Sequence, residues 1–207
     1  MTTLHIVWRG LASVGLLVAA GMGTAGAQEI RDWPCAEPLA ERFVPEAVWG
    51  GPLPGPLPDG WRDDGEVREM VEFAANPENP PSQGARRIAA FAGGLEDGRQ
   101  DRLMRAFAGL LEKFDTLRGF LIGGVRDFVL RAKILREGID RNEAALAALP
   151  PDGGAEVEEQ RRGYLEARFW DARRMDDALE EAEFLCHRYA YLEEKLRRLA
   201  NVVRSEL

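Results

Sequence analysis

The chain has 207 residues, enough for one ordinary domain or two small ones with a sizeable core. Its 35 acidic and 27 basic side chains give a formal net charge of −8, and no basic stripe offsets the repulsion from a phosphate backbone, which argues against nucleic-acid binding. Only two cysteines and two histidines are present, so the composition leaves little room for metal chemistry.

Residues 1–27 have the features of a signal peptide. Arg9 is followed by an apolar run over residues 11–22, and the small residues after it end in an A-x-A sequence at Ala27. We predict cleavage between Ala27 and Gln28, which gives a periplasmic or secreted protein of a bacterial-type cell envelope with no transmembrane segment after processing. The alternative is an uncleaved leader that stays as a membrane anchor.

Residues 28–61 are predicted to form an extended, proline-rich arm. The prolines exclude long helices and remove the donors that a central strand would need. Trp33, Trp49 and Trp61 punctuate the arm. Because large aromatic side chains are unfavourable to leave in water, we expect the arm to lie along the rest of the protein. A proline-rich ligand for the aromatic groove of a partner is the alternative.

Residues 62–207 are predicted to form a helical domain that begins with two short amphipathic helices. The first covers about residues 65–75 and ends at the proline-containing segment that follows. The second covers about residues 83–92, with Ser82 as its N-cap. Both are too short to be stable alone, so they must pack on something larger.

Two long helices are predicted over about residues 98–149 and 155–204. Apolar residues recur in both at steps of three and four, the heptad pattern of a coiled coil, with one stutter near Gly123. The first seam contains Leu103, Phe107, Leu110, Phe114, Leu117, Leu121, Val125, Phe128, Ala132, Leu135, Ile139, Leu146 and Leu149. The second contains Asp171, Met175, Ala178, Ala182, Leu185, Tyr189, Leu192, Leu196, Leu199 and Val203.

A short connection, residues 150–154, joins the long helices, so they should pack as antiparallel neighbours. The predicted fold class is therefore all-α: a long, antiparallel, coiled-coil-like helical hairpin with two short helices and an extended Pro/Trp-rich arm packed on its base. Folding at the connection places Leu117 opposite residues 185–189, and the polar Asn142 near Gln160.

The two halves of the hairpin differ in polarity. From Phe120 to Leu130 the first long helix is apolar on nearly all sides, so we expect the short helices and the arm to cover it. Nearer the connection the seam contains Asn142 and charged residues dominate. This difference predicts a packed base and a projecting, wetter tip.

Cys35 and Cys186 both survive the predicted processing. In an oxidising compartment an even pair of cysteines is normally a disulfide, which would join the arm to the second long helix. The alternative is a redox or ligand thiol, but neither cysteine has the close partner of a C-x-x-C sequence.

Few residues offer catalytic or metal-binding chemistry. His187 is the only histidine after the leader, and we expect it to pair with Glu183 one helical turn earlier. The hydroxyl groups of Ser82, Thr116 and Ser205 lie in no recognised nucleophile sequence. We therefore predict no catalytic, metal or cofactor-binding residues.

The preferred hypothesis is a non-catalytic helical interaction or scaffold protein that binds a protein partner or self-associates through its helices. Its tip or arm would face the partner, with Trp33, Trp49, Asn142 and Arg168 as the candidate residues. The alternative is a helical bundle that binds a small ligand or cofactor. Its pocket would be lined by Phe114, Phe120, Phe128 and Tyr189.

Overall fold

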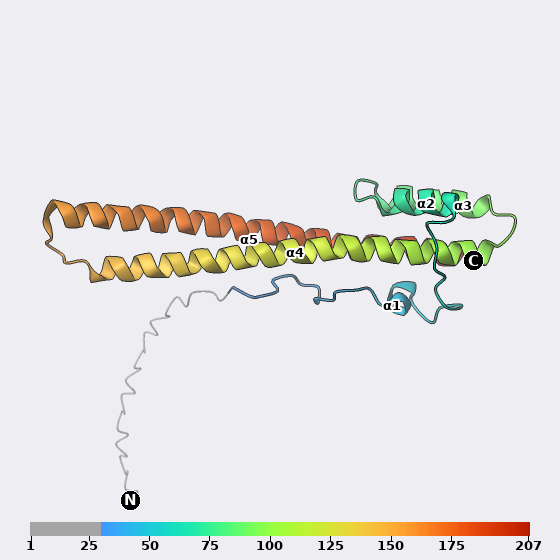
Figure 1. Ribbon diagram of the computed structural model, residues 1–207, viewed down its shortest axis with the longest axis horizontal. Helices are drawn as coiled ribbons and strands as arrows, with labels where there is room; N and C mark the ends of the chain where they lie inside the picture. Colours follow the sequence, from blue (N-terminus) through green and yellow to red (C-terminus); the bar gives the residue numbers. More distant parts are fainter. Residues whose placement is uncertain (1–29) are drawn as a thin grey trace, which may run out of the picture.

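The computed structural model describes residues 30–207, and within that range all regular secondary structure is helical, as predicted. The predicted signal peptide and its cleavage position between Ala27 and Gln28 lie outside the described residues. The helices are α1 (Pro45–Trp49), α2 (Gly65–Ala75), α3 (Pro81–Gly93), α4 (Arg99–Ala148) and α5 (Gly154–Ser205) (Figure 1).

The two long helices, α4 and α5, form the predicted antiparallel hairpin, which gives the molecule its elongated shape (Figure 1). The heptad pattern explains their pairing, since steps of three and four residues keep one side of each helix against the other. The α5 seam is buried as predicted at Met175, Ala178, Ala182, Tyr189, Leu192, Leu196, Leu199 and Val203.

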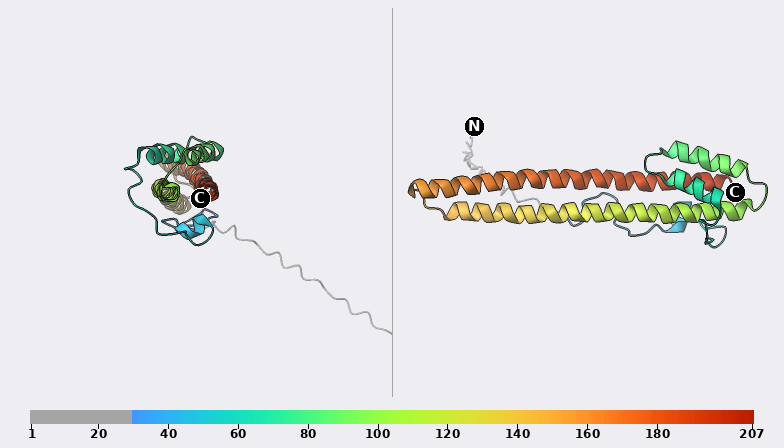
Figure 2. Two further views of the ribbon diagram at one scale, coloured as in Figure 1. Left: turned by 90° about the vertical axis from the view of Figure 1, so that its right-hand side faces the viewer. Right: turned by 45° about the horizontal axis from the view of Figure 1, so that its top comes forward.

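The hairpin is the middle of three layers at its base. Seen end-on, α2 and α3 lie on one face of the hairpin and the arm with α1 lies on the opposite face (Figure 2). The main core fills the space between these layers. Its largest fully buried apolar side chains include Met70, Ile88, Leu103, Phe107, Phe114 and Leu199.

The arm packs on the hairpin, as its tryptophans predict. Trp49 is buried with its ring centroid 4.8 Å from that of Phe107. Trp61 is buried too, and its Nε1 donates a hydrogen bond to Glu112 (2.8 Å). The arm also contains the short helix α1, which the prolines conceal in the sequence; Pro45 occupies its first turn, where no backbone N–H is needed.

Two helix starts show how the chain enters the layer of short helices. Asp64 caps α2 by accepting hydrogen bonds from the backbone N–H groups of Glu66 (3.1 Å) and Val67 (3.2 Å). The prediction that Ser82 caps α3 is wrong. The N-cap is Pro80, and Pro81 is already helical because its fixed φ suits the first turn.

The pairing of α4 with α5 differs from the predicted one by about one to two helical turns. Gly124, and not Leu117, faces Leu185, whose Cδ1 would lie 2.6 Å from a Cβ added at that glycine. Likewise, the side-chain amide of Asn142 lies 3.5 Å from Asp171 Oδ2 and so faces a position well beyond Gln160.

The geometry of the connection agrees with this offset. Leu149 precedes a proline and is extended (φ −71°, ψ 136°), so the chain continues past the end of α4 before it reverses. Helix α5 consequently starts beyond the end of α4 (Figure 1). A hydrogen bond from Arg161 Nη2 to the carbonyl oxygen of Pro150 (3.0 Å) holds the connection against the first turns of α5.

The hairpin has a packed base and a more polar tip. Ile139 on α4 and Met175 on α5 are the last buried residues before the tip, and residues 140–174 are all half-buried or exposed. None of the helices in residues 30–207 is both long and apolar enough to cross a membrane.

Candidate functional site

Along its middle, the hairpin has a face that neither the arm nor the short helices cover, and we call it the open face. It is the continuation, toward the tip, of the face on which α2 and α3 lie, opposite the arm (Figure 2). Large apolar side chains are exposed on α4 beyond α3: Phe120 is 75%, Leu130 58% and Ile134 55% exposed.

The expectation that the short helices and the arm cover the apolar stretch from Phe120 to Leu130 is therefore only half right. The arm covers one side, where Val125 and Val129 are buried against Trp33 and its neighbours. Helices α2 and α3 have 11 and 13 residues and reach only the base of the hairpin (Figure 1). The seam residues Leu121 and Phe128 are only half-buried.

The middle of the open face forms a groove between α4 and α5, which we call the central groove. Its volume is about 770 Å³. Phe128, Leu130, Ile134 and Leu135 supply its apolar wall. Charges of both signs surround this wall, contributed by Asp127, Arg131, Arg174, Asp177 and Glu181. An apolar strip flanked by mixed charges suits a protein surface of similar composition.

A smaller cavity, which we call the base cleft, lies where the α2–α3 layer ends. Its volume is about 370 Å³, and Phe114 and Phe120 contribute to its walls. The four residues predicted to line one ligand pocket therefore do not meet in one place. Phe128 lines the central groove. Tyr189 is buried on the arm side of the hairpin, where its hydroxyl forms a hydrogen bond with the arm.

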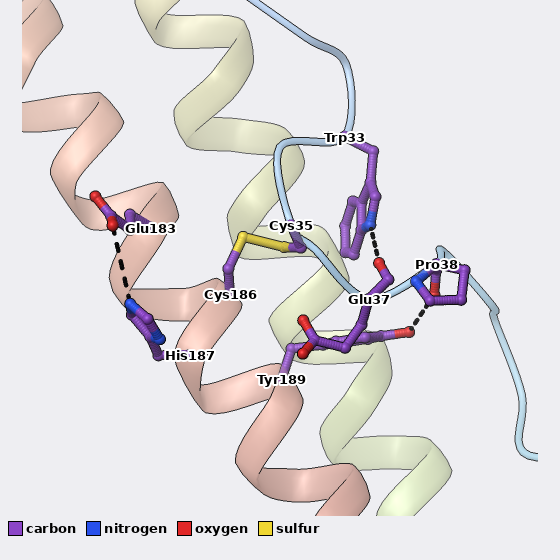
Figure 3. The surroundings of a disulfide bond; sticks show 8 residues. All are labelled: Trp33, Cys35, Glu37, Pro38, Glu183, Cys186, His187 and Tyr189. Atoms are coloured by element: carbon purple, nitrogen blue, oxygen red, sulfur yellow. Dashed lines mark hydrogen bonds and ion pairs between the residues drawn. A yellow bond between two sulfur atoms is a disulfide. The ribbon is translucent and has the colours of Figure 1, made fainter.

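The arm side is held by a disulfide and by a buried polar cluster. Cys35 and Cys186 form the predicted disulfide, which joins the arm to the middle of α5 (Figure 3). Next to it, Tyr189 Oη donates a hydrogen bond to the carbonyl oxygen of Pro38 (3.2 Å) and accepts one from Nε of the buried Arg118 (3.0 Å). These contacts hold the arm against this face of the hairpin.

Arg118 and Lys195 are the two buried charged residues of the described chain, and neither was predicted to be buried. Arg118 is compensated: it pairs with Glu193, and its guanidinium lies 4.1 Å from the Phe43 ring centroid. Lys195 has no carboxylate partner in residues 30–207, and its Nζ donates only to backbone oxygens. The available signal was weak, since Lys195 stands among charged residues and Arg118 has the spacing of an ordinary surface residue.

The residues predicted to face a partner lie in different environments. Trp49 is wrong for this role, because it is buried in the base core. Trp33 is half-buried, packed edge-on against Tyr189 with ring centroids 5.4 Å apart (Figure 3). Asn142 is half-buried near the tip, and Arg168 is exposed there, with Nη1 3.4 Å from Glu143 Oε1.

Two further features complete the surface. Phe169 and Trp170 are exposed neighbours near the tip with ring centroids 5.2 Å apart, a pair that the sequence analysis did not single out. His187 is exposed and its Nε2 lies 3.9 Å from Glu183 Oε1, which agrees with the predicted pairing (Figure 3). Residues 30–207 contain no group of three or more His, Cys, Asp or Glu side chains placed to hold a metal ion.

The geometry defines an all-α protein built on a long antiparallel hairpin, with a disulfide-clamped arm on one face and an open, partly apolar face on the other. Comparison with known proteins adds no relative: no family model matches the chain, and no curated protein or solved structure is similar enough to count as a match.

Proposed function

We propose that this protein is an exported, non-catalytic interaction protein whose open face receives an amphipathic helix of a partner protein. The observation that carries the proposal is the uncovered apolar row on α4, formed by Phe120, Leu130 and Ile134. Exposed apolar side chains of this size are costly to leave in water, and exposed apolar surface on one face is typical of protein interaction sites.

The packing at the base of the hairpin supports this mode of docking. Helices α2 and α3 are amphipathic and pack their apolar sides, including Val67 and Ile88, on the same face at the base. A partner helix with apolar residues at steps of three and four would extend this layer toward the tip. The mixed charges around the central groove favour a partner helix with both signs beside its apolar stripe.

Export is part of the proposal, and two features support it. The leader over residues 1–27 has the order of charge, apolar run and small residues of a signal peptide. The Cys35–Cys186 disulfide is of the kind that persists in an oxidising compartment such as the periplasm or the extracellular space. N-terminal sequencing of the exported chain should begin at Gln28; a chain that keeps its leader in the cytoplasm contradicts export.

Site-specific photocrosslinking in intact cells tests the docking surface. A photoreactive residue in place of Ile134 should give one defined adduct, and a second substitution in the groove, Leu130→Asp, should remove it. The matched control is Val44, an apolar residue that is 59% exposed on the arm. A photoreactive residue there should give no such adduct.

Two results would contradict the proposed surface. The first is an adduct at position 44 that is as strong as the one at position 134, because the arm would then be the contact. The second is an adduct of two copies of this chain, which would identify the open face as a self-association surface. Circular dichroism of each variant checks that the hairpin has formed.

A further inference from the structure

The base cleft has the size and wall composition of a small-molecule site. Its volume of about 370 Å³ falls in the range of about 300–1,000 Å³ that is typical of such sites. The walls come from Pro77 after α2, from Phe114 and Phe120 on α4, and from Tyr191 on α5. Most of the lining is therefore apolar, and two of the aromatic side chains, Phe120 and Tyr191, are exposed at the surface.

The charges of the base cleft are all of one sign. Arg188 and Lys195 are its only charged lining residues, although acidic residues outnumber basic ones in the chain as a whole. The two side chains leave α5 two helical turns apart, so they point to the same side of the helix. The central groove differs, because it includes Asp177 and Glu181 among its charges.

Lys195 is the unusual member of this pair. It is 2% exposed, and its Nζ donates hydrogen bonds to the carbonyl oxygens of Asn76 (2.6 Å) and Asn79 (2.8 Å). An ammonium group has three N–H donors, so these bonds use two of them. Burial lowers the pKa of Lys195 to about 8, and no charged neighbour opposes that effect. A buried charge without a counter-charge is unfavourable, and an anion in the cleft would supply one.

We propose that the base cleft binds a small amphipathic anion, whose alkyl chain packs on Phe120 and Tyr191 and whose carboxylate or phosphate headgroup pairs with Lys195. Arg188 contributes the second positive charge that selects an anionic headgroup. Phe120 also belongs to the apolar row proposed for the partner helix, but calorimetry of the chain alone tests the base cleft without that partner.

Isothermal titration calorimetry of the exported full chain, with its disulfide formed, tests the headgroup. Decanoate should bind once per chain, and neutral decyl maltoside and cationic decyltrimethylammonium should bind at least about tenfold more weakly. Decyl phosphate separates the two sources of the anion: tighter binding than decanoate points to a phosphate lipid, and weaker binding points to a fatty acid. Equal affinity for the cationic amphiphile, or no binding of either anion, would overturn the proposal.

Variants test the location. Phe120→Ala should weaken decanoate binding by about tenfold, because the bound alkyl chain would lose the apolar surface of this exposed ring. Phe169 is the matched control, since it is 61% exposed near the tip, and Phe169→Ala should leave the affinity within about twofold. If both variants weaken binding equally, decanoate adsorbs to any exposed aromatic ring and the proposal is wrong.

The basic residues need two variants, because Lys195 also bonds the segment between α2 and α3. Lys195→Met should weaken decanoate binding by about tenfold while leaving the affinity for decyl maltoside unchanged. Arg188→Gln, at an exposed side chain, should weaken it by about two- to fivefold without affecting folding. Wild-type affinity for decanoate in the folded Arg188→Gln protein would refute the assignment of the headgroup.

Discussion

Removal of the disulfide should destabilise the whole molecule, and the size of the effect follows from the chain between the two cysteines. Cys35 and Cys186 are separated by 151 positions, and in the chain-entropy model a closed loop of that length stabilises the folded state by about 5 kcal/mol as an upper value. The double variant Cys35→Ala/Cys186→Ala should approach this loss, since the open chain gains the conformational freedom that the bond withholds from the unfolded state.

The native fold should survive the substitution. The arm keeps the hydrogen bond from Tyr189 to Pro38, and Trp49 remains buried against Phe107. Urea unfolding followed by far-UV circular dichroism measures the difference in the free energy of unfolding. The slope against urea should rise, because an uncrosslinked chain exposes more surface when it unfolds. The wild-type protein treated with a reductant should unfold like the double variant.

Limited proteolysis shows whether the arm unfolds together with the hairpin. If cleavage of residues 36–42 increases strongly in the double variant while the helices unfold at an unchanged urea concentration, the arm detaches by itself. The disulfide would then be a local clip, and the reasoning from the full loop would be refuted.

Three other predictions concern packing, a buried hydrogen bond and pH. Gly109→Ala should lower the free energy of unfolding by about 1–2 kcal/mol, since a Cβ there would lie 2.8 Å from a tryptophan ring. Gly119→Ala, with open space around it, should raise the free energy of unfolding by about 1 kcal/mol. Urea titrations in which both variants change the free energy of unfolding in the same direction would contradict this contrast. Tyr189→Phe should cost about 1–3 kcal/mol in the same assay, because a buried arginine loses its acceptor; an unchanged midpoint would show that the hydroxyl is dispensable. The hydrogen-bonded Arg102 guanidinium lowers the pKa of Asp64. The wild-type protein should therefore have a higher free energy of unfolding than Asp64→Asn above pH 3.8, the ordinary pKa, and this difference should decline as the pH falls below that value. A difference that stays constant as the pH is lowered would refute the contribution of the ion pair.

Much of the fold could be predicted because its signals are local. The three-four spacing along α4 and α5 reports which side of each helix is buried, and a short connection leaves an antiparallel hairpin as the simple arrangement. The Cys35–Cys186 bond could be predicted by elimination, since an oxidised protein with two cysteines has one possible internal pairing.

The pairing register and the surface of the hairpin depended on tertiary structure. The facing positions of α4 and α5 are shifted by about one to two helical turns from the predicted ones, and no periodicity in either helix contains that shift. Trp49 is a second example of a position that the sequence could not assign. An aromatic residue in a proline-rich arm suits a partner contact or a core equally well, and only the packing on Phe107 shows that Trp49 belongs to the core.

The candidate binding surfaces also depend on how the layers pack on the hairpin. An apolar stretch such as Phe120–Leu130 predicts that something covers it, but the angle and length of the covering elements determine which side stays open. Helices α2 and α3 end early and the arm takes the opposite face, so Phe120 is left exposed beside Lys195. The sequence by itself determined helices α2 to α5, the hairpin and the disulfide, because these depend on spacing along the chain. The open face, the base cleft and the buried charges were decided by tertiary structure, because they depend on where a third layer stops.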